Sequence, residues 1–208
     1  QVRRKDKQRN SQGGQEVWKD SSLKKRLEFC VDLFMNRIYD PSRRHFNLFF
    51  DNEWNSLVEM DSYGHDVETG WLLCEAARTL ENQDLIEQTN QLALDVTEAC
   101  LAEGMSDKGY MIYEKKGDRK TKHASWWGQI ETMIACVNAW QISGSDVYLQ
   151  SVDTVWTFVK DYMIDKEYGE WYSDCFDGEP KKEAPKVSMW RCPYHTVRLG
   201  VEIYNRLK

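Results

Sequence analysis

Predicted helices recur in pairs along this chain, and the second helix of each pair begins with side chains suited to chemistry. The first helix of each pair is an ordinary amphipathic one with apolar residues at helical spacing. The pairs are 22–38 with 66–80, 83–102 with 124–141, and 146–164 with 194–207. Such an internal period indicates stacked helical hairpins. Reactive residues confined to one end of alternate helices predict an all-α toroid, with inner and outer helices and a site at one mouth.

Each of the alternate helices begins with two functional side chains three or four residues apart, which places both on one helix face. The pairs are His65 with Glu68, Trp127 with Glu131, and His195 with Arg198. Histidine is suited to proton transfer because its ordinary pKa is about 6.5. A carboxylate beside it orients the ring and raises its basicity. One such pair is typical of a hydrogen bond at a helix start, but three favour a proton-transfer site.

The chain is rich in tryptophan, with nine among 208 residues. Five of them are hard to bury together, because two are adjacent and three fall in loop-like segments. These are Trp54, Trp126, Trp127, Trp171 and Trp190. Since indole has a broad apolar face that can stack on a sugar ring, the pattern favours a carbohydrate site. Trp140 falls at a core position, and Trp71 is compatible with either the core or the site.

Charge and composition exclude several classes of protein. The net charge of −6 and the lack of a basic stripe argue against a nucleic-acid partner. No apolar run approaches the ~20 residues of a membrane span, and the first twenty residues lack the apolar stretch of a signal peptide. Six scattered cysteines without a CxxC pair predict reduced thiols, not disulfides or a zinc site. A cytoplasmic location is expected.

The segments between the helices are predicted from their turn residues and charges. We expect a disordered or partial lead-in at residues 1–16 and a single domain over 17–208. The remaining expectations are a strand or loop at 46–54, a hairpin arm at 108–114, a solvated charged loop at 115–122, a strand at 170–173 and a loop at 177–188. His45 follows two arginines and is expected to be exposed. His123 is expected to be a solvated residue at a helix start.

Two other kinds of site remain open on these residues. Neighbouring helix residues point apart, so Asp66 does not share the face of His65. A metal would then take its ligands from His65, Glu68, Glu131 and His195. No tight ligand motif such as HExxH is present, and we expect no metal. The second alternative is a glycoside hydrolase on a toroid, which needs two carboxylates flanking a bond; Glu68 and Glu131 are its candidates.

Three stretches carry a resemblance to a known family. They are SYGHDVE (62–68) followed by Trp71, WWGQIE (126–131) and WRCPYH (190–195). In order, spacing and local sequence they resemble the cellobiose 2-epimerase family, within the N-acylglucosamine 2-epimerase-like proteins, over roughly residues 21–208. The resemblance implies an (α/α)6 barrel of which this chain is the C-terminal half, with short β-hairpin arms in the loops. The N-terminal half, which supplies an arginine to the site, is the expected partner.

The resemblance also implies an activity. Members invert C2 of the reducing-end sugar of a β-1,4-linked disaccharide such as cellobiose or lactose, through ring opening and an enediolate. His65 and His195 are implied to transfer the proton on opposite faces of C2. No cofactor is needed, because this exchange leaves the redox state unchanged.

Further roles are implied for the residues around the two histidines. Glu68 would orient His65 or bind a sugar hydroxyl, and Glu131 would bind the substrate or steady a histidine. The residues expected to stack on the sugar are Trp127 and Trp190, and those expected to give support are Tyr63, Trp71 and Arg198. Two alternatives remain: an incomplete barrel that only binds a sugar or a partner, and a monosaccharide 2-epimerase or isomerase of the same superfamily.

Overall fold

The computed structural model describes residues 20–208, so the predicted lead-in at 1–16 lies outside the described residues. Six α-helices form in the described range, as predicted, with ends that differ from the predicted ones by a few residues. They are α2 (Ser21–Leu33), α3 (Tyr63–Leu80), α4 (Gln83–Gly104), α5 (Trp126–Ser143), α6 (Val147–Phe158) and α7 (Tyr194–Arg206). The all-α class is confirmed.

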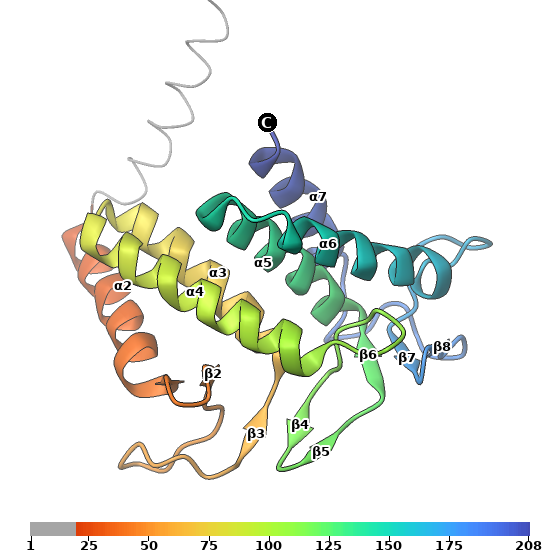
Figure 1. The fold of residues 1–208 in the computed structure, drawn as a ribbon, viewed down its shortest axis with the longest axis horizontal. Coiled ribbons are helices and arrows are strands. Elements are labelled where there is room, and N and C mark those ends of the chain that lie inside the picture. The colour runs from red at the N-terminus through yellow and green to blue at the C-terminus, as the bar shows by residue number, and fades with distance from the viewer. Residues whose placement is uncertain (1–19) are drawn as a thin grey trace, which may run out of the picture.

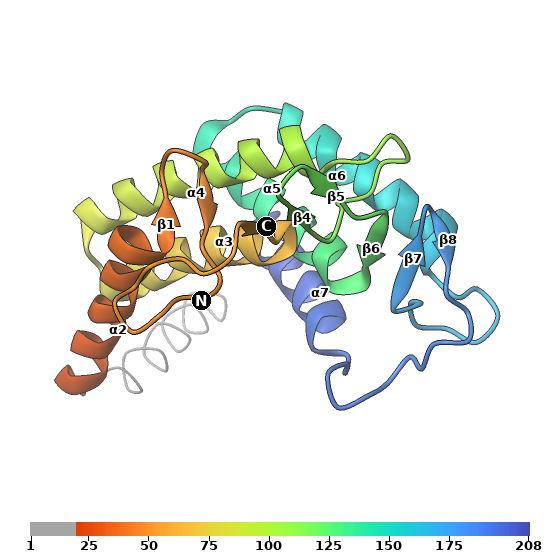
Figure 2. The same cartoon turned by 90° about the horizontal axis from the view of Figure 1, so that it is seen from below.

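The helices form an arc of two rows (Figures 1 and 2). In one row α3 packs against α5, and α5 packs against α7. In the other row α2 and α4 pack against α3, while α6 packs against α5. The rows therefore contain alternate helices of the chain, which is the inner and outer arrangement that the paired sequence pattern predicts.

Side-chain caps help to fix where several helices begin. Asp20 accepts a hydrogen bond from the backbone N–H of Ser22, and Asn82 accepts one from Leu85. Ser125 caps α5 by accepting the N–H of Gly128. These short polar side chains satisfy N–H groups that have no partner within the helix. The cap at Ser125 matters for the site, because α5 begins with the two adjacent tryptophans.

Two helices of the outer row end in a wider turn that the sequence pattern did not predict. The π-helical turn η1 (Phe34–Ile38) follows α2, and η2 (Val159–Met163) follows α6. The N–H of Tyr39 bonds to the carbonyl of Phe34, and the N–H of Ile164 bonds to that of Val159. The backbone then becomes extended at both residues. Apolar spacing continues through a π turn, so the sequence predicted one uninterrupted helix in each case.

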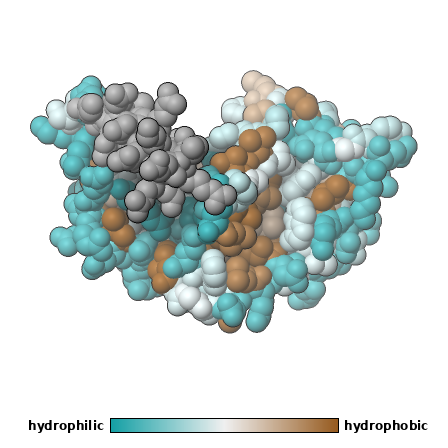
Figure 3. Space-filling model, turned by 90° about the horizontal axis from the view of Figure 1, so that it is seen from above, coloured by the Kyte–Doolittle hydropathy of each residue, from teal (hydrophilic) through white to brown (hydrophobic). Residues whose placement is uncertain are grey.

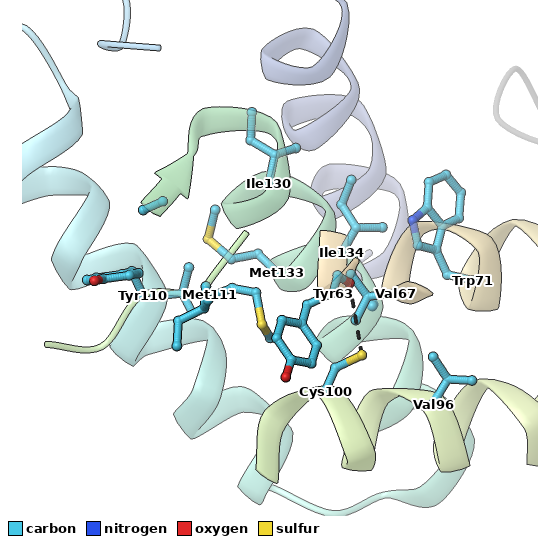
Figure 4. Packing of buried hydrophobic residues seen from close by; sticks show 14 of the residues in the cluster. Tyr63, Val67, Trp71, Val96, Cys100, Tyr110, Met111, Ile130, Met133 and Ile134 are labelled. Carbon is cyan, nitrogen blue, oxygen red and sulfur yellow. Dashed lines mark hydrogen bonds between the residues drawn. The ribbon is translucent and has the colours of Figure 1, made fainter. Parts of the chain in front are cut away.

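The core lies between the rows and centres on α5, which is buried along most of its length. Figure 4 shows residues from α3, α4 and α5 meeting there. Tyr63 and Ile130 are fully buried, and the ring of Tyr63 lies beside Met111. Burial of large apolar side chains contributes roughly 1.5–3 kcal/mol each. This packing holds α3 against α5, and so fixes the relative positions of their first turns.

Within residues 20–208, three small antiparallel sheets lie at one end of the helices (Figure 1). Their orders are β1-β2, β3-β4-β5 and β6-β7-β8. The strands are β1 (Tyr39–Asp40), β2 (His45–Phe46), β3 (Met60–Asp61), β4 (Lys115–Lys116), β5 (Arg119–Lys120), β6 (His123–Ser125), β7 (Asp174–Phe176) and β8 (Glu179–Pro180). The hairpin arms are present, and they extend from the ends of the helices that carry the predicted site residues.

Three of the predicted assignments between the helices are wrong. The predicted loop at 177–188 contains the strand β8, which pairs with β7. The hairpin arm expected at 108–114 lies at 115–120, in the segment predicted to be a solvated loop. Lys115 is held there because its ammonium group lies 3.1 Å from Glu103 and 3.5 Å from Asp61. The strand expected at 170–173 begins at Asp174, where it pairs with β6. In these last two cases a partner far along the chain selects the paired segment, and local composition does not record that partner.

The two ends of the arc are less buried than its middle. In α7 no residue is buried, and in α2 only Val31 is. Val197, Val201 and Tyr204 of α7 are all at least half exposed. Figure 3 shows apolar surface gathered along the middle of the face seen from above. An exposed apolar surface of this kind is typical of a site where another protein segment packs.

The cysteines are spread over the helices and the segments between them. All six cysteines lie in the described range and are free; Cys30 and Cys192 are exposed, and the other four are buried. This agrees with the prediction of reduced thiols. Among residues 20–208 there is no helix with the length and apolar character needed to cross a membrane.

Candidate active site

The first turns of α3, α5 and α7 bring most of the predicted site residues to one pocket of about 390 Å³. This volume lies in the ~300–1,000 Å³ range of small-molecule sites. The predicted residues that line it are His65, Glu68, Trp127, Trp190 and His195. They come from three helix starts and the loop before α7. The core packing of α3, α5 and α7 therefore assembles this pocket from segments that are distant in sequence.

Glu131 lies behind the pocket and holds His195. Its Oε1 is 2.7 Å from Nδ1 of His195, and the carboxylate is fully buried. A carboxylate acceptor at Nδ1 favours the tautomer or charge state with a proton on that nitrogen. This leaves Nε2 of His195 as the nitrogen available for proton exchange in the pocket. Of the two roles expected for Glu131, contact with a histidine is the one that this geometry allows directly.

Three donors satisfy the buried carboxylate of Glu131. Besides His195, the indole Nε1 of Trp71 donates to Oε2 at 2.9 Å, and a guanidinium nitrogen of Arg198 donates to Oε1 at 3.0 Å. The same Arg198 nitrogen bonds to Glu68 at 2.6 Å. An unpaired buried carboxylate is costly, so these donors stabilise the arrangement. Glu68 pairs with Arg198 and not with His65, so it does not orient that histidine.

His65 has a different anchor, which the sequence analysis missed. Nδ1 of His65 lies 2.7 Å from the hydroxyl oxygen of Ser62, the residue that precedes α3. The imidazole packs against Trp127 with ring centroids 4.6 Å apart, and the ring of His195 lies 5.9 Å from the same indole. Both imidazoles therefore contact one indole and line one pocket. Each has its Nδ1 engaged by the protein, so Nε2 is the nitrogen that each ring has left for a ligand.

Gly64 permits this contact between α3 and α5. A Cβ atom added at Gly64 would lie 2.8 Å from the ring of Trp127 and 3.2 Å from the backbone of Gly128. Real Cβ atoms do not approach that closely, so any other residue would displace the indole or the helix. The lack of a side chain at Gly64 therefore lets the first turns of α3 and α5 meet beside the pocket.

Two predicted site residues differ sharply in exposure. Trp190 lies in the loop before α7 and is 85% exposed, so its indole face is free to bind a ligand. Tyr63 is fully buried in the core and does not line the pocket. Tyr63 packs in the core beneath the first turn of α3 and has no contact with the pocket that would give it a direct role. Trp71 and Arg198, the other two residues expected to give support, both donate hydrogen bonds to Glu131.

His123 and Asp174 also line the pocket, and the prediction that His123 is a solvated helix-start residue is wrong. Nε2 of His123 lies 2.6 Å from Oδ1 of Asp174 across the β6–β7 pair. Burial raises the pKa of the Asp174 carboxyl, but hydrogen bonds from His123 and Ser173 outweigh it, and the pKa is lowered. The two residues are 51 positions apart, so no local spacing could have paired them.

The family described as N-acylglucosamine 2-epimerase (GlcNAc 2-epimerase) matches residues 14–198, which is most of the chain. The chain belongs to this family. Among curated relatives, the cellobiose 2-epimerase of Dictyoglomus turgidum is 35% identical over 189 residues, covering 90% of this chain and 48% of the relative. That of Bacteroides fragilis is 38% identical over 192 residues, with the same two shares.

Solved structures agree with the family and with the predicted fold. The cellobiose 2-epimerase from Bacillus thermoamylovorans B4167 is 33% identical and superposes with a TM-score of 0.87, covering 92% of this chain and 49% of that one. The chain thus spans about half the length of the relatives it matches. The prediction of half of an (α/α)6 toroid is confirmed.

The carboxylates of the site also raise the question of a metal in this epimerase-family chain. Ligand atoms of Glu68, Glu131 and His195 lie within 4.8 Å of one another. Arg198 already donates to both carboxylates, at 2.6 and 3.0 Å. A guanidinium therefore occupies the position in which a cation would balance these charges. The arrangement is that of a hydrogen-bonded network that positions His195.

His45 was predicted to be exposed, and this is wrong. It is buried on β2, and its Nδ1 lies 2.7 Å from Oδ2 of Asp66. Asp66 also accepts the backbone N–H of Phe46 at 3.0 Å, which ties β2 to the first turn of α3. Burial lowers the pKa of His45, but the hydrogen bond and charge of Asp66, with Asp61 and Glu103 nearby, outweigh it and raise the pKa. Asp66 points away from His65, as the helix geometry predicted.

Proposed function

We propose that the protein containing this chain inverts the configuration at C2 of the reducing-end sugar of a β-1,4-linked disaccharide such as cellobiose. The observation that supports this best is the shared pocket of His65 and His195. Each imidazole has Nδ1 bound by the protein and packs against Trp127. Two such groups are what a reaction needs if it removes a proton from one face of a carbon and returns one to the other.

The chemistry follows from the acidity of the C2–H bond. That bond is acidic only when C1 is a carbonyl, so the sugar ring opens first. One imidazole then removes the C2 proton, and the electron pair forms a planar enediolate. The other imidazole, protonated, delivers a proton to the opposite face, which regenerates the carbonyl with inverted C2. One proton leaves and one arrives, so the sugar is neither oxidised nor reduced.

Each neighbouring group has a role in this scheme. Glu131 stabilises the imidazolium that forms when His195 accepts a proton, because a buried carboxylate at Nδ1 favours the charged ring. Trp127 and Trp190 offer faces for the sugar. The developing enediolate oxygens need a positive donor, and Arg198 is already committed to Glu68 and Glu131. Since the chain spans about half of its relatives, we assign that donor to the part of the barrel beyond it.

Hydrolysis of a glycosidic bond fits the geometry less well. A hydrolase needs two carboxyl groups flanking the bond, one of them protonated. Glu68 and Glu131 both bind one guanidinium nitrogen of Arg198, and Glu131 is fully buried. The shared guanidinium holds both carboxylates beside it. They therefore lie together on one side, where neither is placed to protonate a leaving oxygen.

The test is isotope exchange at C2 in the complete polypeptide that contains this chain. Incubation of cellobiose in heavy water, followed by NMR, is expected to place deuterium at C2 and to produce glucosyl-mannose. His195→Ala should lower the rate by ~10²–10⁴-fold or more, the contribution of a general acid or base. Thr196→Ser, a change on the neighbouring residue outside the pocket, serves as the control. Absence of label at C2, or cleavage to monosaccharides, would reject the proposal.

A further inference from the structure

One face of the β6–β7–β8 sheet points into the pocket and the other into the core. Ala124 and Cys175 are fully buried on the core side. His123, Asp174 and Phe176 alternate with these residues along the strands, so they lie on the opposite face, and they are more exposed. His123 and Asp174 line the pocket together with the two histidines of the proposed reaction. This sheet therefore forms a wall of the site.

The His123–Asp174 pair is built as a fixed unit. The ring of His123 stacks on Phe176, with centroids 4.8 Å apart and planes 9° from parallel, while Nε2 bonds to Asp174. The side chains of His123 and Asp174 are 20% and 27% exposed. Because the pKa of Asp174 is lowered, its carboxylate is ionised at neutral pH. The pocket wall thus presents a negatively charged acceptor whose orientation is set by the protein.

The proposed proton transfer gives His123 and Asp174 no role. His65 is anchored by Ser62, and His195 by Glu131. Tyr113 links His123 to the reactive imidazoles: its ring centroid is 4.7 Å from His123 and 6.1 Å from Trp127, the indole that both imidazoles contact. His123 and Asp174 therefore line the same pocket as the reactive imidazoles, and the aromatic contacts that join them run through Tyr113 and Trp127. A sugar joined to the reacting one would occupy such a position.

We propose that Asp174, held by His123, binds hydroxyl groups of the second sugar ring and so makes the site select a disaccharide over a monosaccharide. This inference rests on the proposed function. Sugar hydroxyls donate hydrogen bonds, and an ionised carboxylate is the strongest acceptor among side chains. Neighbouring hydroxyls of a pyranose lie close enough to bind both oxygens of one carboxylate. Tyr113 and Phe176 supply aromatic rings that contact His123.

The test compares two ligands that lack the C1 carbonyl and therefore cannot react. Cellobiitol has the second glucose ring, and glucitol does not. In the complete polypeptide, Asp174→Asn should weaken cellobiitol binding by about tenfold or more, the usual effect of losing a hydrogen bond to a charged group. Glucitol binding, measured by the same calorimetry, should stay unchanged, which also shows that the variant is folded. Equal loss for both ligands, or no loss for either, overturns the proposal.

A second variant and a control sharpen the result. His123→Phe keeps an aromatic ring on Phe176 but removes the hydrogen bond to Asp174, and the same selective loss of cellobiitol is expected. Asp177→Asn removes a carboxylate from the adjoining β7–β8 turn that pairs with Lys122 outside the pocket, and should change neither affinity. A selective loss in Asp177→Asn would overturn the assignment to Asp174.

The outcomes separate this inference from the proposed function. If the wild-type protein exchanges C2 hydrogen in cellobiose but Asp174→Asn binds both ligands normally, the second-ring site is rejected and the epimerisation stands. If the wild-type protein shows no exchange, the reaction is rejected. The ligand comparison then still decides whether Asp174 contacts the second ring.

Discussion

Oε1 of Glu131 lies 2.7 Å from Nδ1 of His195, although the residues are 64 positions apart and on different helices. The contact joins α5 to α7, and it is possible only because the two helices pack side by side. A fully buried carboxylate that accepts bonds from His195, Trp71 and Arg198 leaves the imidazole little freedom to rotate. If this fixed orientation of His195 matters for the proposed reaction, variants that alter the hydrogen bonds of Glu131 should change its rate.

Replacement of Glu131 by glutamine should lower the turnover number for C2 exchange by at least about 10²-fold, with little change in KM. The amide has nearly the shape of the carboxylate but does not stabilise the imidazolium of His195. Deuterium incorporation at C2 measures the effect. Glu75→Gln is the matched control, because Glu75 also binds an arginine, Arg206 at 2.6 Å, but lies outside the pocket. Similar rates in both variants would remove Glu131 from the mechanism.

The two histidines should have complementary roles that isotope exchange can separate. If His65 and His195 serve opposite faces of C2, either variant to asparagine abolishes epimerisation. Each variant should still wash deuterium into one epimer, because the remaining imidazole can remove and return a proton on its own face. One variant is expected to label only cellobiose and the other only glucosyl-mannose. Labelling of the same epimer by both variants would contradict the opposed arrangement.

Gly64→Ala should destabilise the fold, although alanine is a better helix former than glycine. The added Cβ would lie 2.8 Å from Trp127, and overpacking of this kind costs about 1–3 kcal/mol. Gly200→Ala on α7 is the control, since nothing lies within 4 Å of its Cβ position; it should gain up to about 1 kcal/mol. Chemical denaturation measures both changes. A loss at Gly200 as large as that at Gly64 would show that sterics against Trp127 are not the cause.

The buried pair of His45 and Asp66 should give the stability a recognisable pH dependence. The folded-state pKa of His45 is raised, so its contribution is fully present below the ordinary value of about 6.5 and is lost as the pH rises through the folded pKa. The free energy of unfolding should therefore fall over that window, by up to about 1.4 kcal/mol per pH unit. Denaturation at a series of pH values measures this slope. His45→Gln should lack it, and an equal slope in both proteins would contradict the assignment.

The sequence located most of the pocket because its signals are local. His65, Trp127 and His195 each stand at the start of a helix whose apolar spacing is clear, so their placement needed only helix periodicity. The alternation of ordinary and reactive helix starts gave the two rows. Where the signal is a contact between distant segments, the predictions were wrong. His45 and His123 follow or sit in charged stretches, yet Asp66 and Asp174 draw them into buried or half-buried pairs.

The hydrogen-bond partners of the predicted residues also differ between local spacing and the structure. Helical spacing suggested that Glu68 would orient the imidazole of His65, which lies three residues before it. In the structure Ser62 anchors His65, and Arg198 of α7 captures Glu68 because the guanidinium also balances Glu131. The strand at 115–116 is likewise fixed by Asp61 and Glu103, two carboxylates that attract Lys115. In each case a charge from another element competes with the local neighbour.

The sequence by itself determined the helices, their order in two rows and which side chains stand at the pocket, because apolar periodicity and helix starts are encoded in neighbouring residues. Tertiary structure alone decided which nitrogen of each histidine is free, that Tyr63 belongs to the core, and that His123 and Asp174 form a wall of the site. Those outcomes depend on contacts between segments tens of residues apart. Such contacts form only when the buried surfaces of α3, α5 and α7 bring the segments together, and the energetic advantage of pairing a buried charge then selects the partner.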